Sequence, residues 1–65
     1  MISREDAIRT VEHYARLRTT FEALRELDRY PFLMPALAEA RAALARGDRS
    51  AALEQLRVAR SEPSP

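Results

Sequence analysis

The sequence has no cysteine, no lysine, one glycine and one histidine among its 65 residues. Without cysteine, the chain can form neither a disulfide framework nor a thiolate metal site. No stretch approaches the roughly 20 consecutive apolar residues that a transmembrane helix needs. The charged run Arg4-Glu5-Asp6 interrupts the start, where a secretory signal would place its apolar segment. We therefore expect a cytoplasmic protein that does not enter the membrane.

The short chain limits the hydrophobic core that a single domain can build. Domains below about 70–80 residues gain only roughly 3–5 kcal/mol of net stability from their core. Natural proteins of this size add disulfides, a metal or a partner, and the residue types present disfavour the first two. We expect one helical domain over residues 1–60 that oligomerises or docks on a larger protein. A well-packed monomeric helical bundle is the alternative.

The composition favours helices, because twelve alanines and eight leucines supply the residues with the highest helix propensity. The fold class that we predict is all-α, with one long helix and a short helical hairpin assembled as an oligomeric bundle. This three-helix arrangement places helices at about residues 3–30, 35–46 and 48–60. Residues 61–65 are polar and rich in proline, so we expect a disordered tail.

The first predicted helix, residues 3–30, is long for so short a chain. Ser3 and the acids after it resemble a capping box, and no glycine or proline follows before Pro31. Apolar side chains recur at heptad spacing, which predicts a long packing face that a partner surface must cover. These positions are Ala7, Thr10 or Val11, Tyr14, Leu17, Phe21 and Leu24.

Opposite charges alternate along the same helix. Glu12 precedes Arg16 by four residues, and Glu26 precedes Arg29 by three. Such pairs stabilise an exposed helix by a few tenths of a kcal/mol each. This pattern predicts a solvated charged face.

The segment Tyr30–Pro35 is unusual for a connection between helices. Phe32, Leu33 and Met34 are large and apolar, and two prolines flank them. Connecting loops normally carry polar turn residues, so this segment is expected to be covered. Two alternatives stay open: it folds into the core, or it contacts a partner.

The second half of the chain predicts a helical hairpin. Gly47 is placed to end the second helix, and Asp48 is placed to cap the third. The turn at Gly47-Asp48, followed by Ala52, Leu56 and Ala59, is similar to the second half of a tetratricopeptide repeat. Residues 36–64 thus resemble a single tetratricopeptide-like helical hairpin. The first half of that pattern has Trp, Leu, Gly and Tyr where this chain has Ala36, Glu39, Ala40 and Ala43.

This resemblance implies the geometry of a helical hairpin and no peptide-binding groove. Arrays of this repeat need at least about three units to bury a continuous core. The sequence holds only one such unit.

Catalytic chemistry has little support in the sequence. The single histidine, His13, has one hydroxyl at helical contact spacing, that of Thr10, and no third group to orient a base. Glu22 and Glu26 are four residues apart, but no Glu-x-x-His pattern accompanies them. We therefore expect no enzyme, no cofactor and no metal site.

The function predicted is that of a small protein-interaction module, acting as a homo-oligomer or as an accessory subunit of a larger complex. The alternative is a small DNA-associated regulator, of phage or antitoxin type, that uses its arginine-rich helix faces. Eleven arginines suit phosphate binding, but ten acids are interleaved with them, so nucleic acid is not favoured. The candidate interface residues are Tyr14, Leu17, Phe21, Leu24, Tyr30, Phe32, Leu33 and Met34.

Overall fold

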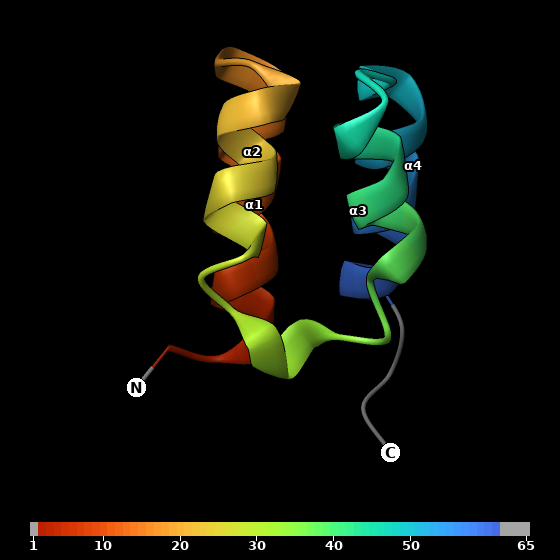
Figure 1. Cartoon of the computed structure of the whole chain (residues 1–65). Helices are drawn as coiled ribbons and strands as arrows, with labels where there is room; N and C mark the ends of the chain where they lie inside the picture. The colour runs from red at the N-terminus through yellow and green to blue at the C-terminus, as the bar shows by residue number, and fades with distance from the viewer. Residues whose placement is uncertain (1, 62–65) are drawn as a thin grey trace.

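Residues 2–61, which the computed structural model describes, fold into four α-helices (Figure 1). These are α1 (Arg4–Leu17), α2 (Thr20–Leu27), α3 (Ala38–Ala45) and α4 (Arg49–Ser61), with a 3-10 turn, η1 (Pro31–Leu33), between α2 and α3. This part of the chain contains no strand. The all-α prediction is confirmed, whereas the prediction of three helices is wrong.

The predicted helix over residues 3–30 is interrupted at Arg18 and Thr19. Arg18 leaves the helical conformation (φ −122°, ψ −133°), and Thr19 is extended (φ −114°, ψ 159°). The Thr19 hydroxyl accepts a hydrogen bond from the Glu22 backbone N–H at 3.0 Å and donates one to Glu22 Oε1 at 3.2 Å. This arrangement is closely related to the capping box. It starts a new helix, so α1 does not continue into α2.

The four helices form two helical hairpins that pack against each other. α1 contacts α2 and α3 contacts α4, while α1 also contacts α4 and α2 contacts α3. In Figure 1 the turns after α1 and after α3 lie at the upper end, and the linker between α2 and α3 crosses the lower end. Each helix therefore runs antiparallel to its neighbours, and the helices cover one another within a single chain.

The core lies between the hairpins and is rich in alanine, which lets the helices approach closely. Fourteen apolar residues are buried, and every helix contributes at least two of them. They are Ala7, Ile8, Val11, Ala15, Ala23, Leu27, Leu33, Leu37, Ala40, Ala43, Leu44, Ala52, Leu56 and Ala59.

The buried face of α1 is rotated from the predicted heptad face. Ile8 is fully buried, although it lies beside the predicted seam, whereas Leu17 on that seam is 65% exposed. The rotation follows from the break at Thr19, because α2 folds back along α1 and no longer extends its seam. The long uncovered apolar face therefore does not exist.

Two arginines join α1 and α4 at both ends. Arg4 Nη1, at the start of α1, donates to the Ala59 carbonyl near the end of α4 at 3.0 Å. Arg49 Nη2, at the start of α4, donates to the Arg18 carbonyl just after α1 at 2.9 Å. Carbonyls at a helix C-terminus lack intrahelical partners, and a cation there also suits the helix dipole. Each helix thus caps the C-terminal end of the other.

The second hairpin forms close to where the sequence predicts it. α3 begins at Ala38, later than the predicted residue 35, because Met34 is extended (φ −93°, ψ 149°) and the N-cap residue Leu37 lies outside the helical region (φ −105°, ψ 23°). Gly47 has a φ of +77°, as expected for the residue that ends α3. Asp48 Oδ1 accepts from the Ala51 N–H at 3.1 Å and caps α4. Ser61 belongs to α4, and the rest of the predicted tail, residues 62–65, lies outside the described residues.

Candidate interaction surface

The structure distributes the eight candidate interface residues over three environments. Leu33 is 2% exposed and belongs to the core, while Tyr14, Leu24 and Tyr30 are partly buried against it. The remaining four are exposed: Leu17, Phe21, Phe32 and Met34.

The exposed members lie at opposite ends of the molecule. Leu17 and Phe21, both 65% exposed, flank the turn between α1 and α2. Phe32, 55% exposed, and Met34, 36% exposed, lie in the linker at the other end. The candidate interface is thus divided between two separate surfaces, and of the predicted heptad positions only Leu17 and Phe21 are exposed.

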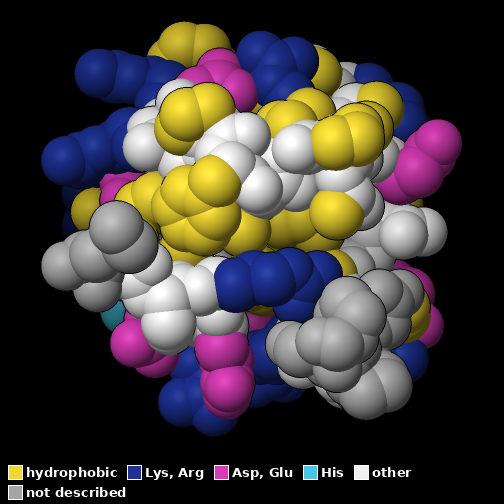
Figure 2. Space-filling model, turned by 90° about the horizontal axis from the view of Figure 1, so that it is seen from below, with side chains coloured by type: hydrophobic (Ala, Val, Ile, Leu, Met, Phe, Trp, Pro, Cys, Tyr) yellow, Lys and Arg dark blue, Asp and Glu magenta, His cyan; other side chains and the backbone are white. Residues whose placement is uncertain are grey.

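The lower end of the molecule gathers apolar side chains across its middle (Figure 2). The linker segment Tyr30–Leu37 crosses this end (Figure 1), and we call its five exposed apolar residues the linker face. They are Pro31, Phe32, Met34, Pro35 and Ala36.

Buried neighbours fix the linker face in place. Leu33 and Leu37 are each 2% exposed and anchor the linker in the core. The Tyr30 ring meets Phe32 edge to face, with the ring centroids 6.1 Å apart. The Tyr30 hydroxyl donates to Glu26 Oε1 at 3.1 Å, and burial together with this hydrogen bond raises the pKa of Tyr30. Tyr30 is partly buried and Leu33 is buried, whereas Phe32 between them is exposed.

An ion pair connects the start of the linker to α3. Arg41 Nε and Nη2 donate to the two carboxylate oxygens of Asp28 at 2.8 and 3.0 Å. The hydrogen bond from Arg41 lowers the pKa of the Asp28 carboxyl. This bidentate ion pair joins the C-terminal end of α2 to α3, next to the linker segment.

Two carboxylates that were predicted to be solvated are in fact buried. Glu12 is 5% exposed and Glu26 is 8% exposed. Glu12 Oε1 lies 3.2 Å from Arg60 Nε, within ion-pair distance, but this oxygen accepts no hydrogen bond. The charged-face prediction considered only pairs within the first helix and missed Arg60, which reaches Glu12 from α4.

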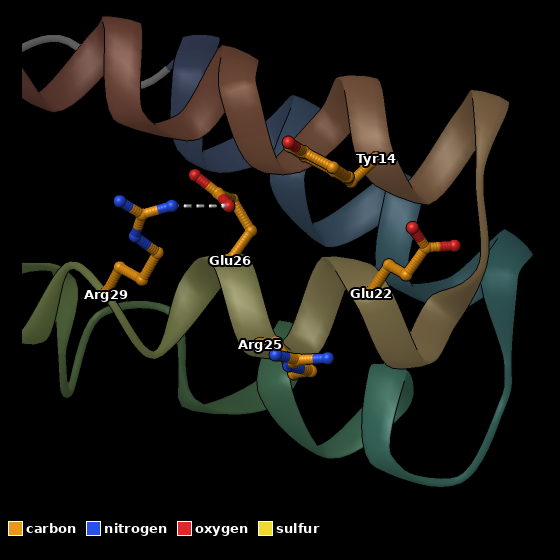
Figure 3. A pocket seen from close by; sticks show the side chains of 5 residues that line it. All are labelled: Tyr14, Glu22, Arg25, Glu26 and Arg29. Carbon is orange, nitrogen blue, oxygen red and sulfur yellow. Dashed lines mark ion pairs between the residues drawn. The ribbon is translucent and has the colours of Figure 1, made fainter.

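A hollow of about 410 Å³ lies between α1 and α2 (Figure 3). The Glu26 carboxylate is 3.5 Å from Arg29 Nη1 along its rim. Its lining carries no nucleophile beside a base, so the hollow has no evident catalytic chemistry. The lining residues are Tyr14, Glu22, Arg25, Glu26 and Arg29.

The only histidine lies in a second hollow, of about 270 Å³, near the buried Glu12. The Thr10 hydroxyl, which lies at helical contact spacing from His13, donates to the Asp6 carbonyl at 2.9 Å instead. The His13 ring lies edge to face against Tyr14, with centroids 5.8 Å apart. Within residues 2–61, no three or more side chains of the types that ligate metals are grouped to hold an ion.

No protein-family model, no curated protein and no solved structure matches this chain. None of the described helices has the length and apolar character to span a membrane.

Proposed function

We propose that this chain is a small non-enzymatic protein-interaction module, and that the linker face is its docking surface. It acts as a homo-oligomer or as an accessory subunit of a larger complex in the cytoplasm. One observation carries the proposal: Phe32 is 55% exposed on a linker that Leu33 and Leu37 anchor in the core.

Covering the Phe32 ring would remove a large apolar surface from water. Large aromatic side chains carry 150–250 Å² of surface each and dominate the energetics of interfaces. Scattered exposed apolar residues are ordinary, but Phe32 lies among four other exposed apolar residues of the linker. A group of exposed apolar residues within one short segment supports a docking role.

The support for this proposal differs from that offered by the sequence alone. The sequence suggested a partner because one long helix had more apolar surface than the rest of the chain could cover. The break at Thr19 removes that argument, since the two hairpins cover each other. The linker face is the part of the predicted interface that still supports docking, through Phe32 and Met34.

The test compares capture by the wild-type chain with capture by two variants of matched chemistry. Phe32→Asp places a charge on the linker face, and Phe21→Asp places the same charge at the other end. We expect Phe32→Asp to lose the retained partner, whether a second protein or the chain itself, with unchanged far-UV circular dichroism. Phe21→Asp should retain it. Equal retention by both variants would contradict the proposal.

The alternative function, a DNA-associated regulator, receives less support from the arrangement of charges. Most arginines lie within 4.0 Å of an acidic oxygen: Arg9, Arg16, Arg18, Arg29, Arg41, Arg46, Arg57 and Arg60. Arg4 and Arg49 donate to backbone carbonyls. Phosphate binding usually needs a concentrated basic patch. Salt-sensitive retention of DNA at about 50 mM salt and micromolar protein would favour this alternative.

A further inference from the structure

We infer that the occupant of the linker face is a second copy of this chain, which docks with its own linker face to form a weak two-fold dimer. This inference rests on the proposed function and names its partner. Charge and symmetry each favour this occupant, and the available area limits the association to a weak one.

The linker face itself carries no charge. The eight residues Tyr30–Leu37 include no acidic or basic side chain. Burying an unpaired charge against such a surface is unfavourable. The matching surface is therefore apolar and uncharged at its centre, as a second linker face is.

The border of this end carries both signs of charge, as Figure 2 shows. Arg4 and Asp6 belong to the first turn of α1, and Glu39 belongs to the first turn of α3; both helices begin at this end (Figure 1). Asp6 and Glu39 form no side-chain ion pair with another described residue, and Arg4 uses only Nη1 to donate to the Ala59 carbonyl. A partner with charge of a single sign would be repelled by part of this border. A copy of the same chain brings both signs and can match acid to arginine across a two-fold axis.

The available area predicts a weak association. A stable interface buries about 800 Å² per partner, roughly a fifth of the 4370 Å² accessible surface of this chain. Five partly exposed linker residues supply only part of that area. We therefore expect a dissociation constant on the order of 100 µM, typical of small, transient interfaces.

Symmetry favours contact between like faces over contact between the two ends. A linker face that docked on the opposite end, beside Phe21, would leave a free site on each chain and allow growth without closure. Two linker faces in contact leave no free linker face, so assembly stops at the dimer.

Sedimentation velocity from about 10 µM to about 1 mM tests this directly. The mass of the wild-type chain should rise from 7.4 kDa toward twice that value and stop there. Phe32→Asp should weaken association by about ten-fold or more, the scale of a lost interface anchor. The matched control Phe21→Asp should change it by less than about two-fold. A wild-type chain that remains at 7.4 kDa, grows without a plateau, or is weakened equally by Phe21→Asp would overturn the inference.

Thiol cross-linking supplies an independent measurement, because the natural chain has no cysteine. With a short bismaleimide at about 100 µM protein, Met34→Cys should form covalent dimers several-fold faster than Phe21→Cys. Exposure alone would favour faster cross-linking at residue 21, because Phe21 is 65% exposed and Met34 only 36%. Equal rates, or faster cross-linking at residue 21, would contradict contact between linker faces.

The two proposals fail in different ways. If the wild-type chain stays monomeric while capture of another protein still depends on Phe32, the dimer is wrong and the interaction module stands. If neither self-association nor capture depends on Phe32, both are wrong.

Discussion

At the scale of single residues, Glu12 shows how the fold uses charge inside a small core. Its side chain is only 6% exposed, and Arg60 Nε lies 3.2 Å from one carboxylate oxygen. The second oxygen is 4.0 Å from Arg16 Nη2, whose side chain is mostly exposed. A buried ion pair contributes little by itself, but removal of one partner leaves an uncompensated buried charge. Arg60 is therefore the residue that makes the burial of Glu12 tolerable.

We expect Arg60→Ala to lower the free energy of unfolding by about 1–3 kcal/mol, because Glu12 loses its closest cation. The Arg60 side chain is 34% exposed, so water offsets part of the loss. Arg57→Ala is the control on the same helix, since Arg57 pairs with Glu54 on an exposed face. Urea unfolding followed by circular dichroism measures both. Equal loss in the two variants would show that Glu12 does not depend on Arg60.

Acid should weaken the fold through Asp28 and Glu54. Hydrogen bonds from Arg41 and Arg57 lower the pKa of these carboxyls below 3.8 and 4.5, their ordinary values. The folded pKa is the lower one, so the stabilisation is complete above the ordinary pKa and is lost as pH falls through the folded pKa. Tm should therefore decline below about pH 4.5, and Asp28→Asn should flatten that decline. An unchanged slope in this variant would contradict a role for Asp28.

At the scale of elements, the turn after α1 decides the architecture. Thr19 Oγ accepts from the Glu22 N–H at 3.0 Å, and Arg49 Nη2 holds the Arg18 carbonyl at 2.9 Å. The first contact is local and starts α2. The second is distant in sequence and ties the turn to α4. Together they convert a continuous helical pattern into a hairpin.

Thr19→Ala should cost about 1 kcal/mol of stability, because the first turn of α2 loses a side-chain acceptor. Thr20→Ala is the matched control, since Thr20 is the first residue of α2 and no hydrogen bond of its hydroxyl is described. Thermal unfolding of the two variants separates capping from the general effect of losing a threonine. A larger loss for Thr20→Ala would show that the cap at Thr19 does not set the break.

The sequence predicts the second hairpin better than the first for a physical reason. Gly47 and Asp48 act through local backbone conformation, which a single sequence expresses directly. The Thr-x-x-Glu signal at residues 19–22 is equally local, but the heptad pattern masked it. Distance in sequence explains the remaining errors, because Arg60 and Arg49 reach α1 across more than thirty residues.

At the scale of the whole molecule, the fold determines which predicted interface residues can meet a partner. The apolar linker could be recognised from its composition, since Phe32, Leu33 and Met34 replace the usual polar residues of a loop. The alternation of inward and outward side chains along the linker could not be predicted from composition. Leu33 turns inward and Phe32 outward only because the linker crosses the end of a closed four-helix body.

The core of this body is small enough that one truncation should largely unfold it. Ile8 is fully buried, whereas Phe21 is 65% exposed. Ile8→Ala should cost about 2–5 kcal/mol, comparable to the roughly 3–5 kcal/mol that a domain of this size has in total. Phe21→Ala should change stability by about 0.5 kcal/mol or less, as surface substitutions do.

Urea titrations of the two variants at concentrations well below that of dimer formation make the comparison, so that self-association does not contribute. Side-chain volume alone would predict the opposite order of stability loss, because phenylalanine is larger than isoleucine. If Phe21→Ala unfolds the chain and Ile8→Ala does not, then α1 and α2 pack through the continuous heptad face and the hairpin is wrong. If Ile8→Ala alone unfolds it, the break at Thr19 has rotated the core, and Phe21 is free to serve as the control surface for docking at Phe32.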